Sequence, residues 1–511
     1  MKHLDRKVAA VVVAIVAMFL PIAADALVTS STTVNFPADG AVLKSGALAS
    51  VSCYAASKCV AVGNYRSDTD ALVYPVVVRF DGSTAVSTKG SYTNGLGYSG
   101  NTGMTSVDCA PNSAGICWAV GNENFPKSNE NIANAQSFIV RLTATTWEPT
   151  RVGTGTFPWS SLSKVSCWTA TQCALGGTLD GASGSSRAAV GFSDNGNVTL
   201  AVLDLSEGLP NTTVAKLQDI SCVSRTACLV VGRYYSGSEV KYFTSSFDGT
   251  RWVTQKLTLP SDALPQDVTF ENAYAVRVSC TESAGCLIVG KYRGQYGYYY
   301  GFYGATSSVQ GVVVTQKIAD TTYIQETDKS YFQISDVDCV GSLSCFITTG
   351  GKPLQFKNSV MAYAESGTTS LNNLGAIDCT DDSNCVGLLG SQSGIASGVP
   401  AGLLGSITSI DFSKSPTPST AIPSVVFLKV TKTATAKSFA DYSKLTVAKT
   451  STVSLKVATA SKRYCAVVST KVKGVTTMKL TGLRKGPCTV TVTVTPKRGS
   501  AKRATVSLRI I

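Results

Sequence analysis

Short apolar runs recur along most of the chain, each bounded by polar residues and usually closed by a glycine. CVAVG, CWAVG, CLVVG and CLIVG are four of them. Successive apolar positions are expected of strands that are buried on both faces. Most runs are followed by a second strand, a turn such as Asp81-Gly82 or Asp248-Gly249, and a further strand. Together with the strand that precedes each run, the pattern predicts four strands per repeat.

Cysteines mark the same repeats. Seven pairs occur, and their first members are separated by 56, 58, 55, 58, 59 and 40 residues. A tight turn brings the ends of two strands into disulfide range, so we predict a disulfide in each hairpin. Zinc is the alternative for paired cysteines, but it needs two pairs to converge. With an eighth pair near the C-terminus, the predicted disulfides are Cys53–Cys59, Cys109–Cys117, Cys167–Cys173, Cys222–Cys228, Cys280–Cys286, Cys339–Cys345, Cys379–Cys385 and Cys465–Cys488.

The repeat length indicates the fold. Four strands in about 55 residues are typical of one β-propeller blade. We therefore predict an all-β protein with a seven-bladed β-propeller over residues 27–411. The last repeat is short, and residues 32–44 resemble the late strands of a blade, so we expect them to complete it and close the ring. A Pro/Ser/Thr-rich linker, residues 412–424, separates the propeller from a strand-like C-terminal region, residues 425–511.

The VSC-x5-C-x-AVG repeat resembles propeller repeats of secreted bacterial proteins. Its Phe-Asp-Gly turns and the turn Ser193–Gly196 are similar to degenerate Asp-box turns of sialidase-like propellers. In residues 425–511, KLTGLRKGPCTVTVTV resembles a stretch of bacterial immunoglobulin-like domains. The resemblance implies a propeller followed by a small immunoglobulin-like β-sandwich. It leaves the activity open, because propellers host many functions.

The chain begins with basic residues, an apolar run Val8–Leu20 and the tripeptide Ala24-Asp25-Ala26. This order predicts a secretory signal peptide over residues 1–26, and an uncleaved anchor is the alternative. No later stretch reaches 18 apolar residues, so we expect no membrane-spanning segment. The mature protein is expected to be secreted, extracellular or associated with the cell surface, where paired cysteines are oxidised.

The only histidine of the chain, His3, lies in this predicted signal peptide. A mature protein without histidine excludes Ser-His-Asp and Cys-His catalysis and every histidine-ligated metal site. The missing histidine does not argue against a carboxylate or tyrosine mechanism, but no catalytic residue, metal ligand or cofactor is assigned from the sequence.

An aromatic segment, residues 291–304, is the first candidate binding feature. Its candidate ligand-binding side chains are Tyr292, Tyr296, Tyr298 and Tyr300. Aromatic faces with hydroxyl tips suit a sugar or a protein surface. Packing between blades is the alternative.

The residue before the first cysteine of each repeat is the second candidate. It is Asp108, Asp338 or Asp378 in three repeats and serine in the other four. Equivalent positions form a ring in a propeller, so a cation site is one interpretation. Capping of local turns by these side chains is the favoured one.

We predict an exported binding or adhesion protein of the cell surface or the extracellular space. Its propeller would present a face to an unknown glycan or protein ligand, and its basic tail would attach to the envelope. The alternatives are a glycan-active hydrolase or lyase of the sialidase-like class and a structural surface protein. An enzyme needs at least two acids, or a tyrosine and an acid, in the central funnel, with arginines nearby. A funnel of serine, threonine and aliphatic residues would count against catalysis.

The charge of the tail generates the first testable prediction. Residues 425–511 carry eighteen Lys or Arg and one acid, Asp441. A solvated surface is one interpretation; binding to an anionic envelope polymer or polysaccharide is the other. Nucleic acid is not favoured, because the aromatic stacking platform is missing. We expect residues 425–511 to bind anionic cell envelope at low salt and to elute as salt rises. Co-sedimentation with envelope fragments measures this, and salt-insensitive or absent binding would contradict it.

Overall fold

The structure is a computed structural model. It describes residues 27–40, 45–90, 101–111, 113–125, 134–152, 159–180, 186–198, 200–205, 209, 214–267, 275–282, 285–294, 299–306, 308–309, 313, 315–318, 334–349, 353–357, 360–363, 374–389, 405–411, 426–428, 433–435, 452–457, 462, 465–472, 475–482, 486–495 and 502–510. The predicted signal peptide and linker lie outside these residues. Within the described part of the chain, no helix has the length and apolar character needed to cross a membrane.

The chain divides into two compact units. The first comprises Met1–Ile318 and Glu326–Ser419, and the second comprises Ala319–Gln325 and Thr420–Ile511. Each unit is described by itself below.

Six sheets of the first unit are meanders of consecutive antiparallel strands. Sheet 1 contains β2 (Gly46–Ala55), β3 (Lys58–Arg66), β4 (Val73–Phe80) and β5 (Ala85–Lys89); sheet 2 contains β6 (Asn101–Asp108), β7 (Cys117–Phe125), β8 (Asn134–Leu142) and β9 (Trp147–Arg151); sheet 3 contains β10 (Trp159–Cys167), β11 (Gln172–Asp180), β12 (Ser186–Asp194) and β13 (Ala201–Val202). Sheet 4 contains β14 (Ala215–Ser224), β15 (Ala227–Ser236), β16 (Glu239–Phe247) and β17 (Trp252–Leu257), with β18 (Gln266–Asp267) beside β16; sheet 5 contains β19 (Val276–Thr281), β20 (Gly285–Arg293), β21 (Tyr299–Ala305) and β22 (Gln316–Lys317); sheet 6 contains β23 (Ile334–Val340), β24 (Ser344–Thr349), β25 (Leu354–Lys357) and β26 (Val360–Tyr363).

Sheet 7 joins the two ends of this unit. Its strands are β27 (Leu374–Asp381), β28 (Asn384–Leu389), β29 (Gly405–Asp411) and, at the outer edge, β1 (Leu27–Val34). β1 pairs antiparallel with β29, from Leu27 opposite Asp411 to Val34 opposite Gly405. The N-terminal segment therefore completes the last sheet, as expected. The strand starts earlier than the expected residues 32–44, and a short 3-10 helix, η1 (Ala38–Gly40), follows it.

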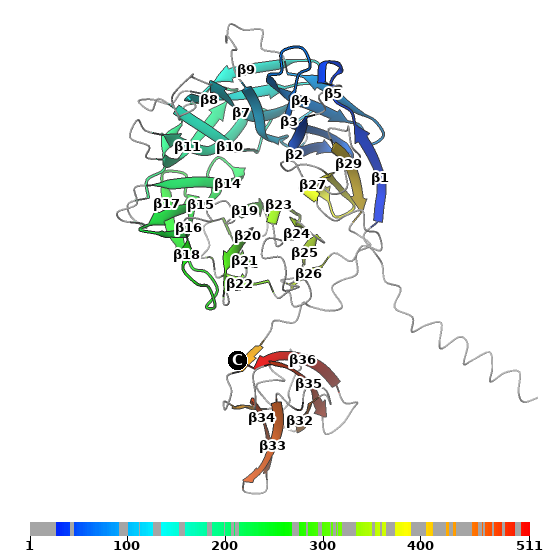
Figure 1. The fold of residues 1–511 in the computed structure, drawn as a ribbon, viewed down its shortest axis with the longest axis vertical. Coiled ribbons are helices and arrows are strands. Elements are labelled where there is room, and N and C mark those ends of the chain that lie inside the picture. The colour runs from blue at the N-terminus through cyan, green and yellow to red at the C-terminus, as the bar shows by residue number, and fades with distance from the viewer. Residues whose placement is uncertain are drawn as a thin grey trace, which may run out of the picture. The chain divides into compact units, whose positions relative to one another are not determined.

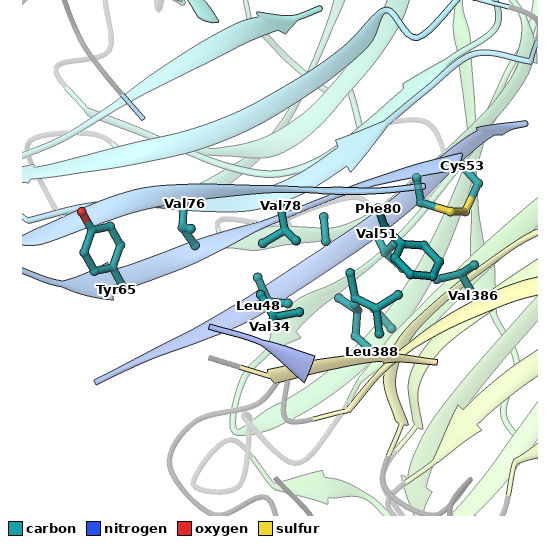
Figure 2. Packing of buried hydrophobic residues seen from close by; sticks show 14 of the residues in the cluster. Val34, Leu48, Val51, Cys53, Tyr65, Val76, Val78, Phe80, Val386 and Leu388 are labelled. Carbon is teal, nitrogen blue, oxygen red and sulfur yellow. A yellow bond between two sulfur atoms is a disulfide. The ribbon is translucent and has the colours of Figure 1, made fainter. Parts of the chain in front are cut away.

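The sheets surround a common centre (Figure 1). The first strand of each sheet contacts the first strand of the next, and β27 contacts β2. Apolar side chains from sheets 7 and 1, among them Val34, Leu48 and Leu388, pack together in the interface that closes the ring (Figure 2). The predicted fold class, an all-β propeller, is confirmed by this arrangement of repeated four-stranded sheets.

All seven hairpin disulfides of the first unit are formed, with Cα–Cα distances between 3.9 and 4.1 Å. Each one joins the end of the innermost strand to the beginning of the second strand. Cys465 in the second unit is also disulfide-bonded. Because the side chain of Cys488 lies outside the described residues, the pair Cys465–Cys488 stays a prediction.

In sheets 1 to 4, the glycine that closes the apolar run faces an irregularity in the innermost strand. In sheet 3 the register shifts between Leu162 and Lys164, opposite Gly177 and Gly176. A Cβ atom on Gly177 would lie 2.3 Å from the carbonyl oxygen of Ser161. Sheets 1, 2 and 4 repeat both the register shift and the close approach, at Gly63, Gly121 and Gly232. The bulged backbone therefore explains the glycine in the repeat.

The variant Gly177→Ala tests this explanation. The added methyl group must displace backbone, so we expect the free energy of unfolding to fall by about 1–3 kcal/mol, measured by chemical denaturation. The matched control is Gly103→Ala, where the nearest atom to the new Cβ is the side-chain nitrogen of Asn64 at 3.3 Å. An equal loss in both variants would show that the bulge is not the cause.

The second unit contains two small sheets in its described residues. One contains β30 (Val426–Leu428), β36 (Lys502–Ile510), β35 (Gly486–Thr495) and β32 (Thr452–Val457), with β30 parallel to β36; the other contains β31 (Thr433–Thr435), β34 (Val475–Gly482) and β33 (Cys465–Val472). The unit is all-β as expected, and its immunoglobulin-like character stays a prediction.

Candidate functional site

A continuous ring of hydrogen bonds joins the seven sheets at their centre. In each innermost strand, the side chain before the first cysteine accepts a hydrogen bond from the backbone N–H of the next sheet's first cysteine. The seven accepting residues, called the polar ring below, are Ser52 (to Cys109, 3.0 Å), Asp108 (to Cys167, 2.6 Å), Ser166 (to Cys222, 2.9 Å), Ser221 (to Cys280, 3.0 Å), Ser279 (to Cys339, 3.0 Å), Asp338 (to Cys379, 2.7 Å) and Asp378 (to Cys53, 2.9 Å).

The polar ring exists because an innermost strand has an open edge at the centre of a propeller. Its backbone N–H groups have no strand partner there, and an unpaired buried donor is costly. The neighbouring sheet supplies an oxygen instead. The capping role expected of the three aspartates is therefore present, but the expectation of local turns was wrong. The partner is the backbone of the next sheet.

A second set of charged side chains lies on the same innermost strands. Lys164, Asp219 and Asp336 each precede the first cysteine of their repeat by three residues. Lys164 of sheet 3 places its Nζ 3.5 Å from Asp219 of sheet 4 and 3.7 Å from Asp336 of sheet 6. These contacts take the lysine side chain across the centre of the ring. These charged residues were not predicted from the sequence, although their shared position in the repeat could have indicated that they lie on the same ring.

A cavity of about 740 Å³ opens at the disulfide ends of the sheets and is lined by the polar ring. Its size lies within the usual range of ligand pockets. Tyr54 and Trp168 also line it. The charged lining residues are Asp108, Glu282, Asp338 and Asp378, and none of the described lining residues is a lysine or arginine. Three acids from three sheets thus converge in the central funnel, as an enzyme would need, whereas the expected arginines do not line it.

Burial raises the pKa of each aspartate in the polar ring. The pKa of Asp108 rises to about 6 and that of Asp338 to about 7. The pKa of Asp378 also rises well above its usual value, first because of burial and then because of the charges of Asp338 and Asp108. The three side chains are half-buried and keep access to the cavity. The raised pKa values favour the protonated form of these carboxyl groups toward neutral pH, so the cluster can supply a proton.

Ser52 links two of these acids. Its hydroxyl lies 3.2 Å from Asp108 Oδ1 and 3.4 Å from Asp378 Oδ1. A hydroxyl group has one hydrogen to donate, so it can serve only one carboxylate at a time. A proton on the other carboxyl group completes the hydrogen bonding, which is consistent with the raised pKa values.

The tyrosines of the aromatic segment lie elsewhere. Tyr292 is fully buried, and its hydroxyl donates to Asp262 at 2.7 Å. The ring of Tyr300 is covered by Lys317, whose Nζ is 3.3 Å from the ring centroid. Both residues occupy the end of sheet 5 opposite to its disulfide. Tyr296 and Tyr298 lie outside the described residues, so ligand binding by this segment stays a prediction.

No metal centre is evident in the part of the chain that the structure describes. No three or more His, Cys, Asp or Glu side chains there are grouped to hold an ion. The cation-site interpretation of Asp108, Asp338 and Asp378 therefore gains no support.

No protein-family model matches the sequence, and no curated protein matches it. Solved structures do resemble it. A Hadza microbial sialidase is 10% identical over 59% of this chain and 63% of its own, with a TM-score of 0.38. An α-L-arabinofuranosidase from Fusarium graminearum is 11% identical over 76% and 99% of the two chains, also with a TM-score of 0.38. A Trypanosoma rangeli sialidase is 9% identical over 67% and 58%, with a TM-score of 0.35. The chain thus spans about three fifths of the length of either sialidase.

These comparisons correct the main functional prediction. We expected a non-catalytic binding and adhesion protein, but the similar structures are sialidases and arabinofuranosidases. The central funnel also contains acids and not only serine, threonine and aliphatic residues. The prediction of a non-catalytic binding and adhesion protein is therefore withdrawn.

The raised pKa values predict how stability depends on pH. Between about pH 4 and pH 7 the folded protein holds protons that the unfolded chain has released. Its free energy of unfolding should therefore fall as pH rises through this window. Asp338→Asn, which keeps an oxygen for the N–H of Cys379, should reduce that dependence in thermal unfolding between pH 5 and 8. The control Asp248→Asn removes a turn carboxylate whose pKa is lowered to about 2, so it should leave the slope unchanged. A stability that rises with pH in this window would refute the assignment.

Proposed function

We propose that the protein is a glycan-active hydrolase whose reacting groups are carboxyls of the polar ring. The observation that carries the proposal is the convergence of Asp108, Asp338 and Asp378, each with a raised pKa, on one cavity. They come from sheets 2, 6 and 7, so the assembled ring brings them together.

Glycoside hydrolysis needs one carboxylic acid to protonate the leaving oxygen and one carboxylate to act as base or nucleophile. Because both contact Ser52 Oγ, at 3.2 and 3.4 Å, the Oδ1 atoms of Asp108 and Asp378 are at most about 6.6 Å apart, which suits such a pair. Burial first, and then the charges of Asp338, Asp108 and Asp336, raise the pKa of Asp378 and favour its protonated form. Asp108, with a pKa of about 6, is the better carboxylate at neutral pH.

In the proposed reaction Asp378 gives its proton to the glycosidic oxygen as the bond from that oxygen to the anomeric carbon breaks. Asp108 acts either as a general base or as a nucleophile. It takes a proton from the water that attacks the anomeric carbon, or it forms a bond with that carbon that water later cleaves. The proton of the water returns to the carboxyl pair. No histidine is needed, and the only histidine of the chain, His3, lies in the predicted signal peptide.

The seven disulfides support an oxidising location, and we infer export from the cytoplasm. The charge of residues 425–511 supports binding to an anionic polymer. Both inferences are independent of the catalytic proposal.

The test is hydrolysis of a panel of polysaccharides and aryl glycosides between pH 4 and 7. We expect Asp378→Asn and Asp108→Asn each to lower kcat by about a hundredfold or more, since each removes one half of an acid–base pair. The matched control is Ser221→Ala, a change in the polar ring on a hydroxyl that caps Cys280. An equally large loss of kcat in Ser221→Ala would show that the loss comes from disturbing the polar ring and not from removing an acid. Absence of hydrolysis of every glycan by the unmodified protein would overturn the proposal.

A further inference from the structure

A cluster of four aromatic side chains extends from the cavity across sheets 3 and 4. We call Trp168, Phe192, Phe247 and Trp252 the aromatic track. Trp168 lines the cavity, and its ring meets that of Phe192 edge-on at 6.2 Å between centroids. Phe192 stacks on Trp252 at 6.2 Å, with 11° between the ring planes, and lies 5.1 Å from Phe247. The track is therefore continuous with the cavity at one end.

The strand register places the whole track at the disulfide end of the sheets. Phe192 precedes Ser193, which pairs with Cys173, and Phe247 pairs with Cys228. Trp252 pairs in turn with Phe247 on the outer strand β17. The track thus leads outward from the cavity along the same face of the propeller.

The four rings remain accessible in part. All are half-buried, packed on one side against the core of sheets 3 and 4. The exposed side chain of Arg225 places its guanidinium 6.0 Å from the centroid of Phe192. An aromatic face beside a hydrogen-bond donor suits a sugar ring, which offers apolar C–H groups on its face and hydroxyls at its edge.

Asp108 connects the acids of the polar ring with the aromatic track. Asp108 accepts the N–H of Cys167, the residue before Trp168. A sugar bound at the acids would therefore have its neighbours in a chain beside Trp168. Because the cavity is lined by four acids and, among its described residues, by no base, an anionic sugar would meet like charge.

From this geometry we propose that the substrate is a neutral oligosaccharide chain, with one sugar in the cavity and its neighbours along the aromatic track. The proposal rests on the proposed hydrolase function and adds the class of substrate and the residues that bind it. It places an aromatic binding surface on sheets 3 and 4, in addition to the one predicted for the tyrosine segment of sheet 5.

The experiment compares ligand lengths by titration calorimetry on the full chain carrying Asp378→Asn, which prevents turnover. The probes are the disaccharides and hexasaccharides of arabinan, xylan, cellulose and chitin, with sialyllactose as the anionic probe. At least one neutral hexasaccharide should bind about tenfold or more tightly than its disaccharide. Trp252→Ala should remove that advantage and leave disaccharide affinity unchanged, and sialyllactose should bind least.

Tyr74→Ala is the matched control, because it removes a half-buried aromatic ring at the end of sheet 1 opposite to its disulfide. It should change neither affinity. If Trp252→Ala fails to fold in a thermal unfolding check, Arg225→Ala removes an exposed part of the same surface and should weaken hexasaccharide binding alone. Affinity independent of length, an equal loss with Tyr74→Ala, preference for sialyllactose, or binding of no probe would each overturn the inference.

The two proposals fail in different ways. Hydrolysis by the unmodified protein without any effect of ligand length would keep the hydrolase function and refute the track. Length-dependent binding that Trp252→Ala abolishes, without hydrolysis of any glycan, would keep the track and refute the hydrolase.

Discussion

The hydrogen bond from each first cysteine's N–H to the side chain of the preceding sheet is the constraint on which the centre of the propeller depends. Innermost strands present an open edge there, and no backbone is available to pair with it. Each sheet satisfies the next, so the bonds are complete only when Asp378 of the last sheet reaches Cys53 of the first. The adjacent disulfides hold the same cysteines in hairpins. Closure of the ring and the convergence of the three aspartates are thus consequences of one repeated contact.

Serine and aspartate both accept this hydrogen bond, so either residue allows the ring to form. Which of the two is present decides only whether that position carries a titratable group. A serine supplies an oxygen without charge, and an aspartate supplies the same oxygen together with a titratable group. Placing three carboxyls in the ring costs desolvation and mutual repulsion, which appear as raised pKa values. The scaffold tolerates them because each one still caps a backbone N–H. The three carboxyl groups that carry this free-energy cost are also the groups that can donate or accept a proton.

Much of the fold was predictable from the sequence, and less of the site. The spacing of the cysteine pairs and the apolar runs predicted the strands, the hairpin disulfides and the repeated sheets, because those features are local. The position of Asp108, Asp338 and Asp378 in the repeat even indicated a ring. The crossing contact of Lys164 with Asp336 could not be predicted, since it depends on which sheets face each other across the centre. The aromatic track was missed for a similar reason: Trp168 and Phe192 of sheet 3 lie far from Trp252 of sheet 4 in the sequence, and the track forms only when these two sheets pack together.

The order of the acids around the ring connects the fold with the candidate site. Asp338 and Asp378 belong to consecutive sheets, and Ser52 joins Asp378 to Asp108, so the acids occupy one arc that ends at Cys167. The hydroxyl members Ser166, Ser221 and Ser279 fill the rest. Trp168 begins the aromatic track where the arc ends, so charge and apolar surface are divided between neighbouring sectors of one face. A ring with acids at every position would repel itself without gaining a reacting pair, and a ring of serines would close the fold without any acid. The observed division sets the aspartates beside an aromatic surface with Arg225 at its side, which suits the neutral sugar chain that we propose.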